Sequence, residues 1–459
     1  MLTEGRLVEY VCRTTLGDVP QAVLRVIKNQ VLAVLGTTIA GASAEGCEAV
    51  VELEKELGGR AEASILIHGG KVPAEKAAFV NGVMARALDF CDALVPGAHI
   101  GSATIPAALA SAELAGGCSG ADFLTAVTVG TELGIRLNLG ESQYDGFDPT
   151  GVCVPFASTA AAAKILRLSE EETWNALALA FNRCGGSFQA NVDGALAVRV
   201  IEGWVAETGV TCARLARRGI TGPANFLEGV YGYFHLFGRD RVEAQTVTSH
   251  LGNDYEVQNV MFKKYPSCGL TQGSTDVILS LMKENGFDSD DVKRIEVTVP
   301  PYTYKLVGRP FEVGTNPKVN AQFSIPYCVA NALLRKSSRL EHFEESFIRD
   351  PRVLELADRV DVLSDPAMEI RGHTPLDMRV LTKAGREHVG KMDTAPGFPG
   401  NPLTQKDHVQ RFRDCIGFAA SALPEKIADR IMDAVEHLET AGDIRDLIPL
   451  LVLDSESTH

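Results

Sequence analysis

Apolar–polar alternation, the pattern of a half-buried strand, is confined to one part of this chain. Residues 294–299 alternate in this way and are stopped by Pro300-Pro301, and residues 378–389 predict a hairpin. Before about residue 260 and after about residue 404, apolar residues instead recur at helical spacing. The chain has 459 residues, too many for one core. The sequence therefore predicts a mainly α protein with a second, smaller α/β domain.

The predicted helices are rich in small and apolar residues, a composition that suits close packing on several sides. They are residues 21–41, 74–90 and 123–139, a helix from Ser169 to about Gly185, and a helical tail from 404 to about 441. Ser119 and Ser169 each precede an acidic residue by three positions, which predicts a capping box. We expect the tail to pack back on the first helices. The predicted domains are residues 1–265 with 400–459, a large, discontinuous all-helical domain, and residues 266–399, the smaller α/β domain.

The net charge limits the partners that the protein can bind. A formal charge of −15 argues against nucleic acid or an anionic membrane, since both favour a basic face. An acidic ligand is compatible if Arg and Lys are gathered locally. The first 20 residues lack a signal pattern, and no apolar stretch is expected to reach membrane-spanning length. We therefore expect no nucleic-acid partner and no membrane partner.

Motifs that bind metals or nucleotides are missing from the sequence. The ten cysteines are scattered, with no Cys-x-x-Cys pair and no His/Cys cluster at ligand spacing. This pattern predicts reduced thiols in a cytoplasmic protein and no metal. The sequence has no Walker A, G-x-G-x-x-G, G-x-S-x-G or H-E-x-x-H motif, which disfavours nucleotide, flavin and zinc-hydrolase functions.

The first segment that could carry chemistry is residues 88–102. Asp89 and Asp92 stand at the end of the predicted apolar helix, where a negative charge opposes the helix dipole and needs a compensating reason. His99 lies in a glycine-bounded loop just before the next helix. A histidine there, with a carboxylate in reach, can carry a proton. The alternative is a histidine that only holds the loop together through a hydrogen bond.

Further segments place polar residues in apolar or glycine-rich settings. Asp148, in the Gly-Phe-Asp-Pro-Thr-Gly run, predicts an Asp-Pro turn and a helix N-cap. Arg199 could bind a carboxylate through two N–H groups, or could form a surface ion pair with Glu202. A domain junction is where small ligands commonly bind. The remaining candidates are Lys263 and Lys264 at the predicted junction, and Tyr304 and Arg309 after the first strand of the small domain.

Taken in order, these segments resemble the MmgE/PrpD superfamily over essentially the whole chain. Each marker is weak alone, and together they are specific. The markers are Leu88-Asp89-Phe90 with His99; Gly-Phe-Asp-Pro-Thr-Gly (146–151); Gly-Ile-Thr-Gly-Pro (219–223) with Leu-Glu-Gly (227–229); Lys-Lys-Tyr-Pro-Ser-Cys (263–268); Ala-Gln-Phe-Ser-Ile-Pro-Tyr (321–327); and Gly-Asn-Pro-Leu-Thr (400–404). The resemblance implies a helical domain, a lid-like α/β domain over the active site, a homodimer, and neither metal nor organic cofactor.

The resemblance also implies site residues, with some departures. Residues that match the decarboxylase branch of the family are Asp89, His99 and Lys263. Residues near the places of its second lysine and its tyrosine are Arg199 and Tyr304. Residues that replace family histidines are Asp148 and Gln272, and Ala93 replaces a threonine. These departures leave the exact reaction open.

The reactions of the family make or protonate a carbanion beside a carboxylate, and the developing charge needs preorganised cations. The candidate catalytic residues are His99, Asp89, Tyr304, Tyr144 and Asp148. The candidate substrate-binding residues are Lys263, Lys264, Arg199, Arg309, Asp92 and Gln272. The favoured function is a cofactor-independent lyase, a dehydratase or decarboxylase, acting on a small di- or tricarboxylic acid. The alternatives are an epimerase or isomerase of a dicarboxylate, and a non-catalytic carboxylate-binding protein.

Overall fold

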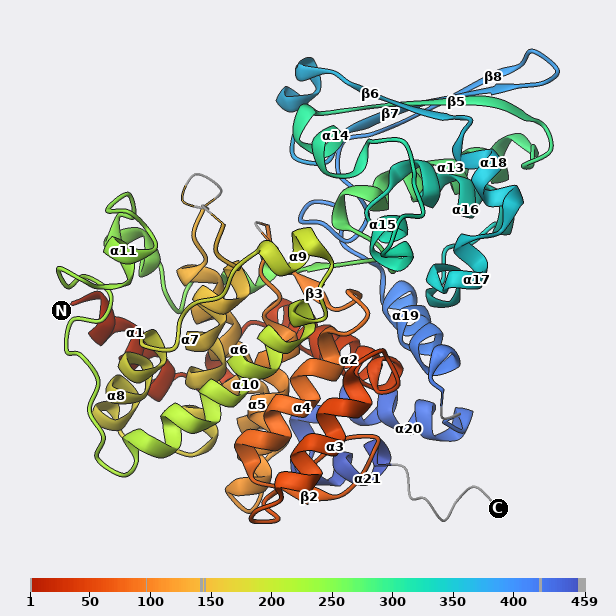
Figure 1. Ribbon diagram of the computed structural model, residues 1–459. Coiled ribbons are helices and arrows are strands. Elements are labelled where there is room, and N and C mark those ends of the chain that lie inside the picture. Colours follow the sequence, from red (N-terminus) through yellow and green to blue (C-terminus); the bar gives the residue numbers. More distant parts are fainter. Residues whose placement is uncertain (1, 96, 141–142, 144–145, 421–422, 453–459) are drawn as a thin grey trace. The chain divides into compact units, whose positions relative to one another are not determined.

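The computed structural model describes residues 2–95, 97–140, 143, 146–420 and 423–452 (Figure 1). The chain divides into two units. Unit 1 comprises Met1–Val260 and Arg411–His459, and unit 2 comprises Met261–Gln410. Most of the described chain is helical and its sheets are small, so the prediction of a mainly α protein with a smaller α/β part is confirmed.

Unit 1 is built from helices that come from both ends of the chain. They are α1 (Thr3–Arg13), α2 (Gln21–Gly41), α3 (Cys47–Leu57), α4 (Ala74–Arg86), α5 (Gly101–Leu114), α6 (Gly120–Leu137), α7 (Pro149–Ile165), α8 (Glu170–Phe181), α9 (Gln189–Asp193), α10 (Ala197–Ala216), α11 (Tyr233–Leu236), α12 (Ala244–Val247), α20 (Glu425–Glu436) and α21 (Ile448–Leu451). The boundary between the units falls inside α19 (Gln405–Phe418).

Local sequence signals set several of these helix limits. α2 has the predicted ends, and Ser169 forms the predicted capping box at the start of α8. At α6, the Ser119 hydroxyl accepts a hydrogen bond from the backbone N–H of Asp122 at 3.0 Å. α8 ends at Phe181, earlier than predicted. The prediction of an all-helical domain is wrong in one detail, because β1 (Ala63–Ser64) and β2 (Lys71–Val72) satisfy their backbone groups by antiparallel pairing.

Glycines allow α10 to cross α4 and α7 at short distance. A Cβ atom on Gly203 of α10 would lie 2.6 Å from the carbonyl oxygen of Phe79 in α4. One on Gly209 would lie 2.6 Å from the carbonyl oxygen of Ser158 in α7. Atoms at these distances overlap, so the crossings require glycine. Polar side chains on the three helices are thereby brought close together.

The expectation that no apolar stretch reaches membrane-spanning length is wrong for α2. By length and composition alone, this helix is apolar enough to cross a membrane. In the structure, however, 83% of its apolar window is buried. A helix that is apolar all round is also the pattern of a helix inside a large core, and α2 occupies that position in unit 1.

Unit 2 contains a four-stranded mixed sheet in the order β6-β5-β7-β8. β5 and β6 are parallel, and β5, β7 and β8 are successively antiparallel. The hairpin predicted at 378–389 is confirmed by the pairing of β7 and β8, and β6 was not predicted. The strands are β4 (Met261–Phe262), outside this sheet, and β5 (Val292–Val299), β6 (Val360–Ser364), β7 (Leu376–Thr382) and β8 (Glu387–Met392).

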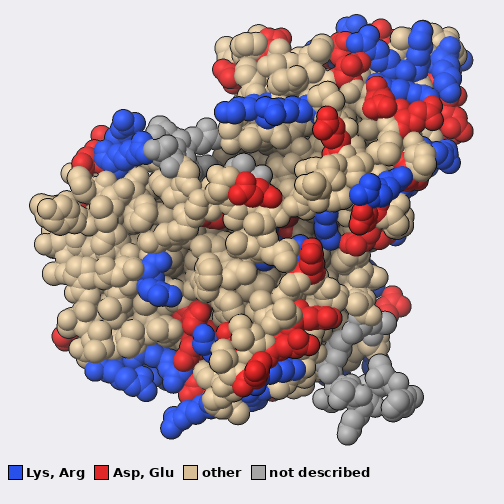
Figure 2. All heavy atoms as spheres, viewed as in Figure 1, with Lys and Arg blue, Asp and Glu red and all other residues tan. Residues whose placement is uncertain are grey.

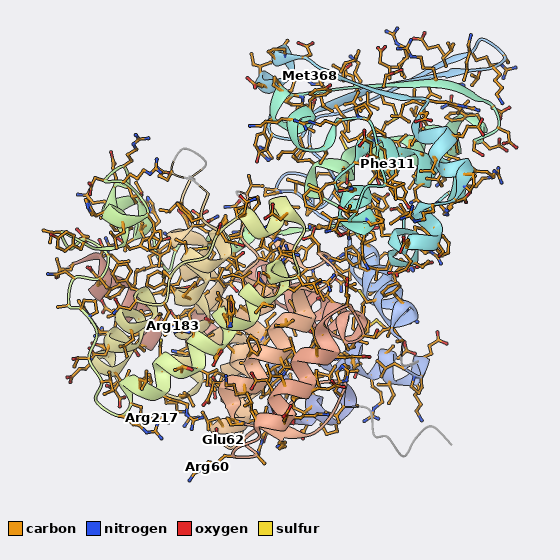
Figure 3. All side chains as sticks on the ribbon, viewed as in Figure 1. Arg60, Glu62, Arg183, Arg217, Phe311 and Met368 are labelled. Carbon is orange, nitrogen blue, oxygen red and sulfur yellow. The ribbon has the colours of Figure 1, made fainter. Side chains whose placement is uncertain are left out.

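Helices of unit 2 cover one face of this sheet and form its core. The inward residues of β5 and β7, such as Val297 and Val380, are fully buried in one cluster with residues of α13 and α16. Phe311, labelled in Figure 3, lies among these helices with its ring centroid 5.0 Å from that of Tyr327. The helices are α13 (Gln272–Asn285), α14 (Pro301–Val307), α15 (Pro317–Gln322), α16 (Ile325–Arg335), α17 (Glu345–Ile348) and α18 (Pro351–Ala357).

The net charge is not shared between the units. Residues 261–410 contain equal numbers of acidic and basic residues, so the charge of −15 belongs to unit 1. Figure 2 shows basic and acidic side chains interspersed over unit 2. Many are paired across its sheet, as Arg294 is with Asp361 at 2.6 Å. An anionic molecule would therefore meet less opposing charge on unit 2 than on unit 1.

Candidate active site

The helix predicted at residues 74–90 ends earlier in the structure, and the segment between α4 and α5 is longer than expected. α4 stops at Arg86 rather than near residue 90, so Asp89 and Asp92 are not helix-terminal residues. Asp89 has a left-handed backbone conformation with φ 52°, and Asp92 belongs to the short strand β3 (Asp92–Ala93). The last turn of α4 carries a basic residue, Arg86, as the helix dipole favours. Its guanidinium forms an ion pair with Asp89 at 2.6 Å, and both side chains are largely buried.

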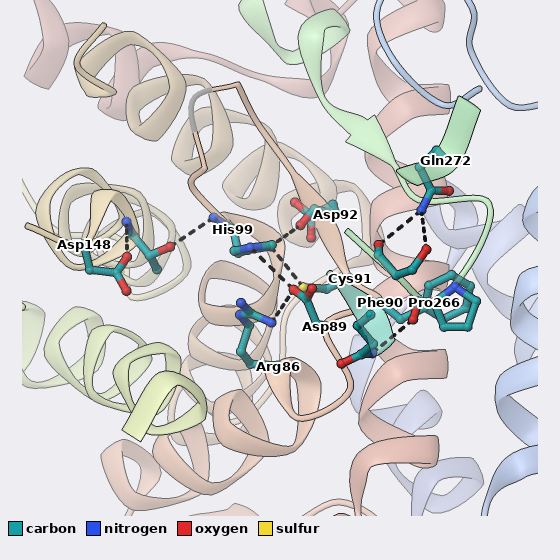
Figure 4. A network of polar contacts seen from close by, with 12 residues as sticks. Arg86, Asp89, Phe90, Cys91, Asp92, His99, Asp148, Pro266 and Gln272 are labelled. Atoms are coloured by element: carbon teal, nitrogen blue, oxygen red, sulfur yellow. Dashed lines mark hydrogen bonds and ion pairs between the residues drawn. The ribbon is translucent and has the colours of Figure 1, made fainter. Parts of the chain in front are cut away.

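His99 is held in one tautomer by the backbone. Its Nδ1 lies 2.8 Å from the carbonyl oxygen of Asp92 and 3.3 Å from the Sγ of Cys91 (Figure 4). A carbonyl oxygen can only accept a hydrogen bond, so Nδ1 carries the proton and the neutral ring has its lone pair on Nε2. Nε2 lies 3.9 Å from a carboxylate oxygen of Asp89. The basic nitrogen of His99 is therefore next to an acidic side chain that favours its protonated form.

The side chain of Asp92 is occupied inside unit 1. It is 1% exposed, and its Oδ2 accepts hydrogen bonds from Gln30 at 2.8 Å and from the backbone N–H of Gly101 at 2.9 Å. A Cβ atom at residue 101 would lie 2.5 Å from the other carboxyl oxygen, so the contact requires glycine. Burial raises the pKa of Asp92, and the hydrogen bonds from Gln30 and Gly101 oppose this effect by favouring the anion. Asp92 thus anchors the start of α5 and, through its backbone, His99.

A second buried guanidinium supports the same segment from the C-terminal part of the chain. Arg411 of α19 donates a hydrogen bond to the carbonyl oxygen of Phe90 at 2.6 Å, and its guanidinium lies 4.5 Å from the centre of the Phe90 ring. Both contacts fix the residue just before Cys91 and Asp92.

Asp148 is the N-cap of α7, so the predicted N-cap is confirmed. Its carboxylate accepts a hydrogen bond from the backbone N–H of Thr150 at 2.9 Å. The hydroxyl of Thr150 accepts one from the backbone N–H of His99 at 3.2 Å, so the start of α7 is tied to the His99 loop (Figure 4). Burial raises the pKa of Asp148, opposed by the hydrogen bond from Thr150 and the charge of Arg86.

Glu202 is a buried neighbour of these groups that sequence reasoning missed. It lies on α10, is 0% exposed, and within the described part of the chain neither carboxyl oxygen has a hydrogen-bond partner. Burial raises the pKa of Glu202 well above its ordinary value, and Asp148 and Asp92 add to this effect. The charge of Arg86 and the Thr150 hydroxyl oppose it. The suggested surface ion pair between Arg199 and Glu202 is therefore wrong. Arg199 instead donates a hydrogen bond to the backbone carbonyl of Glu45.

The charge of Arg86 acts on several buried carboxyl groups of this cluster. Burial opposes the charge of Arg86, but Asp89 and the neighbouring carboxyl groups outweigh burial and raise the pKa of Arg86. The carboxyl groups that its charge influences include Asp89, Asp148 and Glu202. Unit 1 thus provides an imidazole whose Nδ1 is bound to the backbone, an aspartate paired with Arg86 and further buried carboxyl groups.

The candidates in unit 2 gather around one loop. Lys263 is 4% exposed and follows β4. Lys264 is paired with Asp276 at 2.6 Å. Gln272 is fully buried; its amide oxygen accepts from the N–H of Tyr265 at 2.9 Å, and its nitrogen donates to the carbonyl oxygen of Tyr265 at 3.0 Å. Gln272 therefore fixes the shape of the loop that carries both lysines.

The other candidates lie on or next to α14, or outside the described residues. Tyr304, on α14, is half-buried against the core of unit 2, and Arg309 is exposed just after that helix. Tyr144 lies outside the described residues. The structure thus brings Asp89, Asp92, His99 and Asp148 together in unit 1, and Lys263, Lys264 and Gln272 together in unit 2. Across the described residues, no group of three or more His, Cys, Asp or Glu side chains is placed to hold a metal ion.

The residues that sequence reasoning missed are Arg86, Cys91, Thr150 and Glu202. A signal existed for Arg86, because a charged residue inside a helix of small and apolar residues needs a buried partner. For Glu202 no such signal existed, since its burial follows from the helix crossings.

Comparison with known proteins gives a consistent result. Residues 5–245 match the model of the MmgE/PrpD N-terminal domain, and residues 265–440 match that of the MmgE/PrpD C-terminal domain. Cis-aconitate decarboxylase of Homo sapiens is 28% identical over 395 residues, which cover 83% of this chain and 80% of that protein. The Mus musculus protein of the same name is 27% identical over 445 residues, covering 94% and 89%. The 2-methylcitrate dehydratase of Escherichia coli K12 is 24% identical over 358 residues, covering 72% of each.

Proposed function

Because the chain belongs to the MmgE/PrpD family, we propose that it is a lyase that acts, without a cofactor, on a small di- or tricarboxylic acid. The names of its relatives include a decarboxylase and a dehydratase, which break a carbon–carbon and a carbon–oxygen bond respectively. Both reactions need a proton carrier next to the carbon that bears the carboxylate.

The observation that carries the proposal is the orientation of His99. Its Nδ1 faces the Asp92 carbonyl, so the basic Nε2 is the nitrogen that exchanges a proton with the substrate. Asp89 lies 3.9 Å from Nε2 and stabilises the imidazolium that forms, while the Arg86 ion pair holds Asp89 in place.

Two reactions use this arrangement in opposite directions. In dehydration, His99 takes the proton from the carbon beside the carboxylate, and the neighbouring hydroxyl leaves as water with a proton donated by the candidate acid Tyr304. In decarboxylation, the carbon–carboxyl bond breaks, carbon dioxide leaves, and protonated His99 returns a proton to the carbanion. In both, negative charge collects on the remaining carboxylate, which preorganised cations stabilise. We assign this task mainly to Lys263, because the ammonium of Lys264 is already paired with Asp276. Arg309 is the second candidate.

The test is incubation of the purified protein with cis-aconitate, 2-methylcitrate and related acids in deuterated water. An alkene product or released carbon dioxide supports the lyase. Deuterium at the carbon beside the carboxylate without net conversion would instead show an epimerase or isomerase. Binding without exchange or conversion across the whole panel would show a non-catalytic carboxylate-binding protein. Dialysis against a chelator should leave the rate unchanged.

A further inference from the structure

Glu202 combines complete burial with missing hydrogen bonds. Its side chain is 0% exposed, and among the described residues neither of its oxygens makes a hydrogen bond of regular geometry. Burial raises the pKa of Glu202 more than Arg86 and the nearby Thr150 hydroxyl lower it. An ionised carboxylate without a partner costs far more to bury than a neutral carboxylic acid. Glu202 can therefore stay ionised only if a nearby cation compensates its charge.

The cation near Glu202 is already engaged. The guanidinium of Arg86 on α4 forms its 2.6 Å ion pair with Asp89, and its charge also acts on Asp148 at the start of α7. The other groups whose charges act on Glu202 are acidic: Asp148 of α7 and Asp92 of β3. The Cys153 thiol of α7, itself under the influence of Glu202 and Asp148, adds no positive charge.

Asp148 differs from Glu202 in what surrounds its oxygens. It accepts the backbone N–H of Thr150 and caps the positive end of the α7 dipole, and both features favour its anion. Glu202 has neither feature, because it lies inside α10 and accepts no backbone N–H; the nearby Thr150 hydroxyl favours its anion, but it also acts on Asp148. Of the two carboxyl groups, Glu202 therefore has the surroundings that favour the protonated form more strongly.

We propose that Glu202 is a neutral carboxylic acid in the working protein, and that this neutrality reserves the charge of Arg86 for Asp89, keeping Asp89 ionised beside His99. The second part rests on the proposed function of His99. Glu202 is thus a positioning residue, which acts through Arg86 and touches no reacting atom. It also limits the negative charge of a site that receives an anionic substrate.

Infrared difference spectroscopy of the full-length protein at neutral pH tests the protonation state without any assay of activity. A carboxylic-acid carbonyl band that is present in the spectrum of wild type should be absent from the spectrum of Glu202→Gln. The control is Glu132→Gln, because Glu132 is equally buried but paired with Arg136 at 2.6 Å and bonded by two backbone N–H groups. Its difference spectrum should show the loss of a carboxylate band. A carboxylate band lost with Glu202→Gln would overturn the proposal.

Kinetics test the second part. Since Gln is also neutral, Glu202→Gln should keep kcat/KM within about threefold of wild type and leave the acidic limb of its pH profile in place. If Glu202 were ionised, its removal would shift that limb to lower pH, because the imidazolium would lose a stabilising charge.

If Glu202→Gln does not fold, carbon-13 NMR of wild type labelled at glutamate carboxyls replaces it, and the absence of a carboxylic-acid signal at neutral pH would overturn the proposal. A protein inactive on every acid would defeat the proposed function and leave the spectroscopic result standing.

Discussion

The Nδ1 atom of His99 lies 2.8 Å from the backbone carbonyl oxygen of Asp92, and this contact sets which ring nitrogen is basic. The carbonyl belongs to a residue whose own side chain is fixed by Gln30 and Gly101. The orientation of the imidazole therefore depends on the packing of β3 against α2 and α5. Asp89, the carboxylate expected within reach of His99, lies on the Nε2 side of the ring.

His99→Ala should abolish turnover while the fold is kept. General bases contribute about 10²–10⁴-fold to the rate, so kcat/KM should fall by at least about a hundredfold. The matched control is His437→Ala, since His437 is an exposed histidine at the end of α20 and should be dispensable. Steady-state kinetics and thermal unfolding measure the two effects. More than about a tenth of the wild-type rate in His99→Ala would remove His99 from the role of general base.

Arg86→Gln and Asp89→Asn should each destabilise unit 1 strongly. Their side chains are 8% and 15% exposed, so either substitution leaves a buried charge without its partner, at a cost of about 3–5 kcal/mol. The double variant should lose less than the sum of the two. The exposed pair Arg25–Glu436 is the control, and its single variants should lose less than about 1 kcal/mol. Additive losses in denaturant unfolding would show that Arg86 and Asp89 are not energetically coupled.

The two neighbouring lysines should differ in their effect on substrate binding. Lys263→Ala should raise KM about 10–100-fold, the loss expected for one charge-assisted contact with a carboxylate. Lys264→Ala should change KM little, because that ammonium is already paired with Asp276. Kinetics with the best acid from the substrate panel measure both. Unchanged KM and kcat in Lys263→Ala would place that lysine outside the binding site.

Two glycine-to-alanine substitutions should have opposite signs. At Gly203 the added methyl group would lie 2.6 Å from the carbonyl oxygen of Phe79, so the crossing of α10 and α4 must open and stability should fall by about 1–3 kcal/mol. At Gly417 of α19 the methyl group meets nothing within 4 Å, and alanine should stabilise the helix by about 0.5–1 kcal/mol. Equal thermal shifts in the two variants would contradict the close crossing.

Elements with complete local signals could be predicted from the sequence. α2 has a long apolar repeat that ends in glycine, α8 begins with a capping box, and the hairpin of β7 and β8 alternates around a glycine turn. In each case the residues that decide the structure are neighbours in the chain.

The features that could not be predicted depend on distant contacts. α4 was expected to continue through residues 87–90, whose apolar pattern suits a helix, but Arg86 and Asp89 pair in a turn instead. Glu202 was expected near the surface, because an acidic residue three positions after Arg199 suits an exposed ion pair. Its burial results from the glycine crossing at Gly203, which periodicity does not reveal.

The stability of the protein should fall when the pH is lowered, in part because of His342 in unit 2. Burial lowers the pKa of this histidine to about 4. Its Nδ1 accepts a hydrogen bond from the backbone N–H of Arg339 at 3.2 Å, a bond that the protonated ring cannot accept. The charged groups that face it are Glu341, Arg335 and Arg339.

The sign of the effect follows from proton binding. The pKa of His342 in the folded state lies below the value of about 6.5 in the unfolded state, so between these values the unfolded chain binds more protons. The contribution of His342 is complete above about pH 6.5 and is lost as the pH falls towards 4, by about 3 kcal/mol in total. Urea unfolding of the full chain at pH 7 and pH 5 measures it. His342→Gln should be less stable at pH 7 and lose less between the two pH values, because a glutamine does not take up a proton; an equal loss in both proteins would show that other groups set the acid sensitivity.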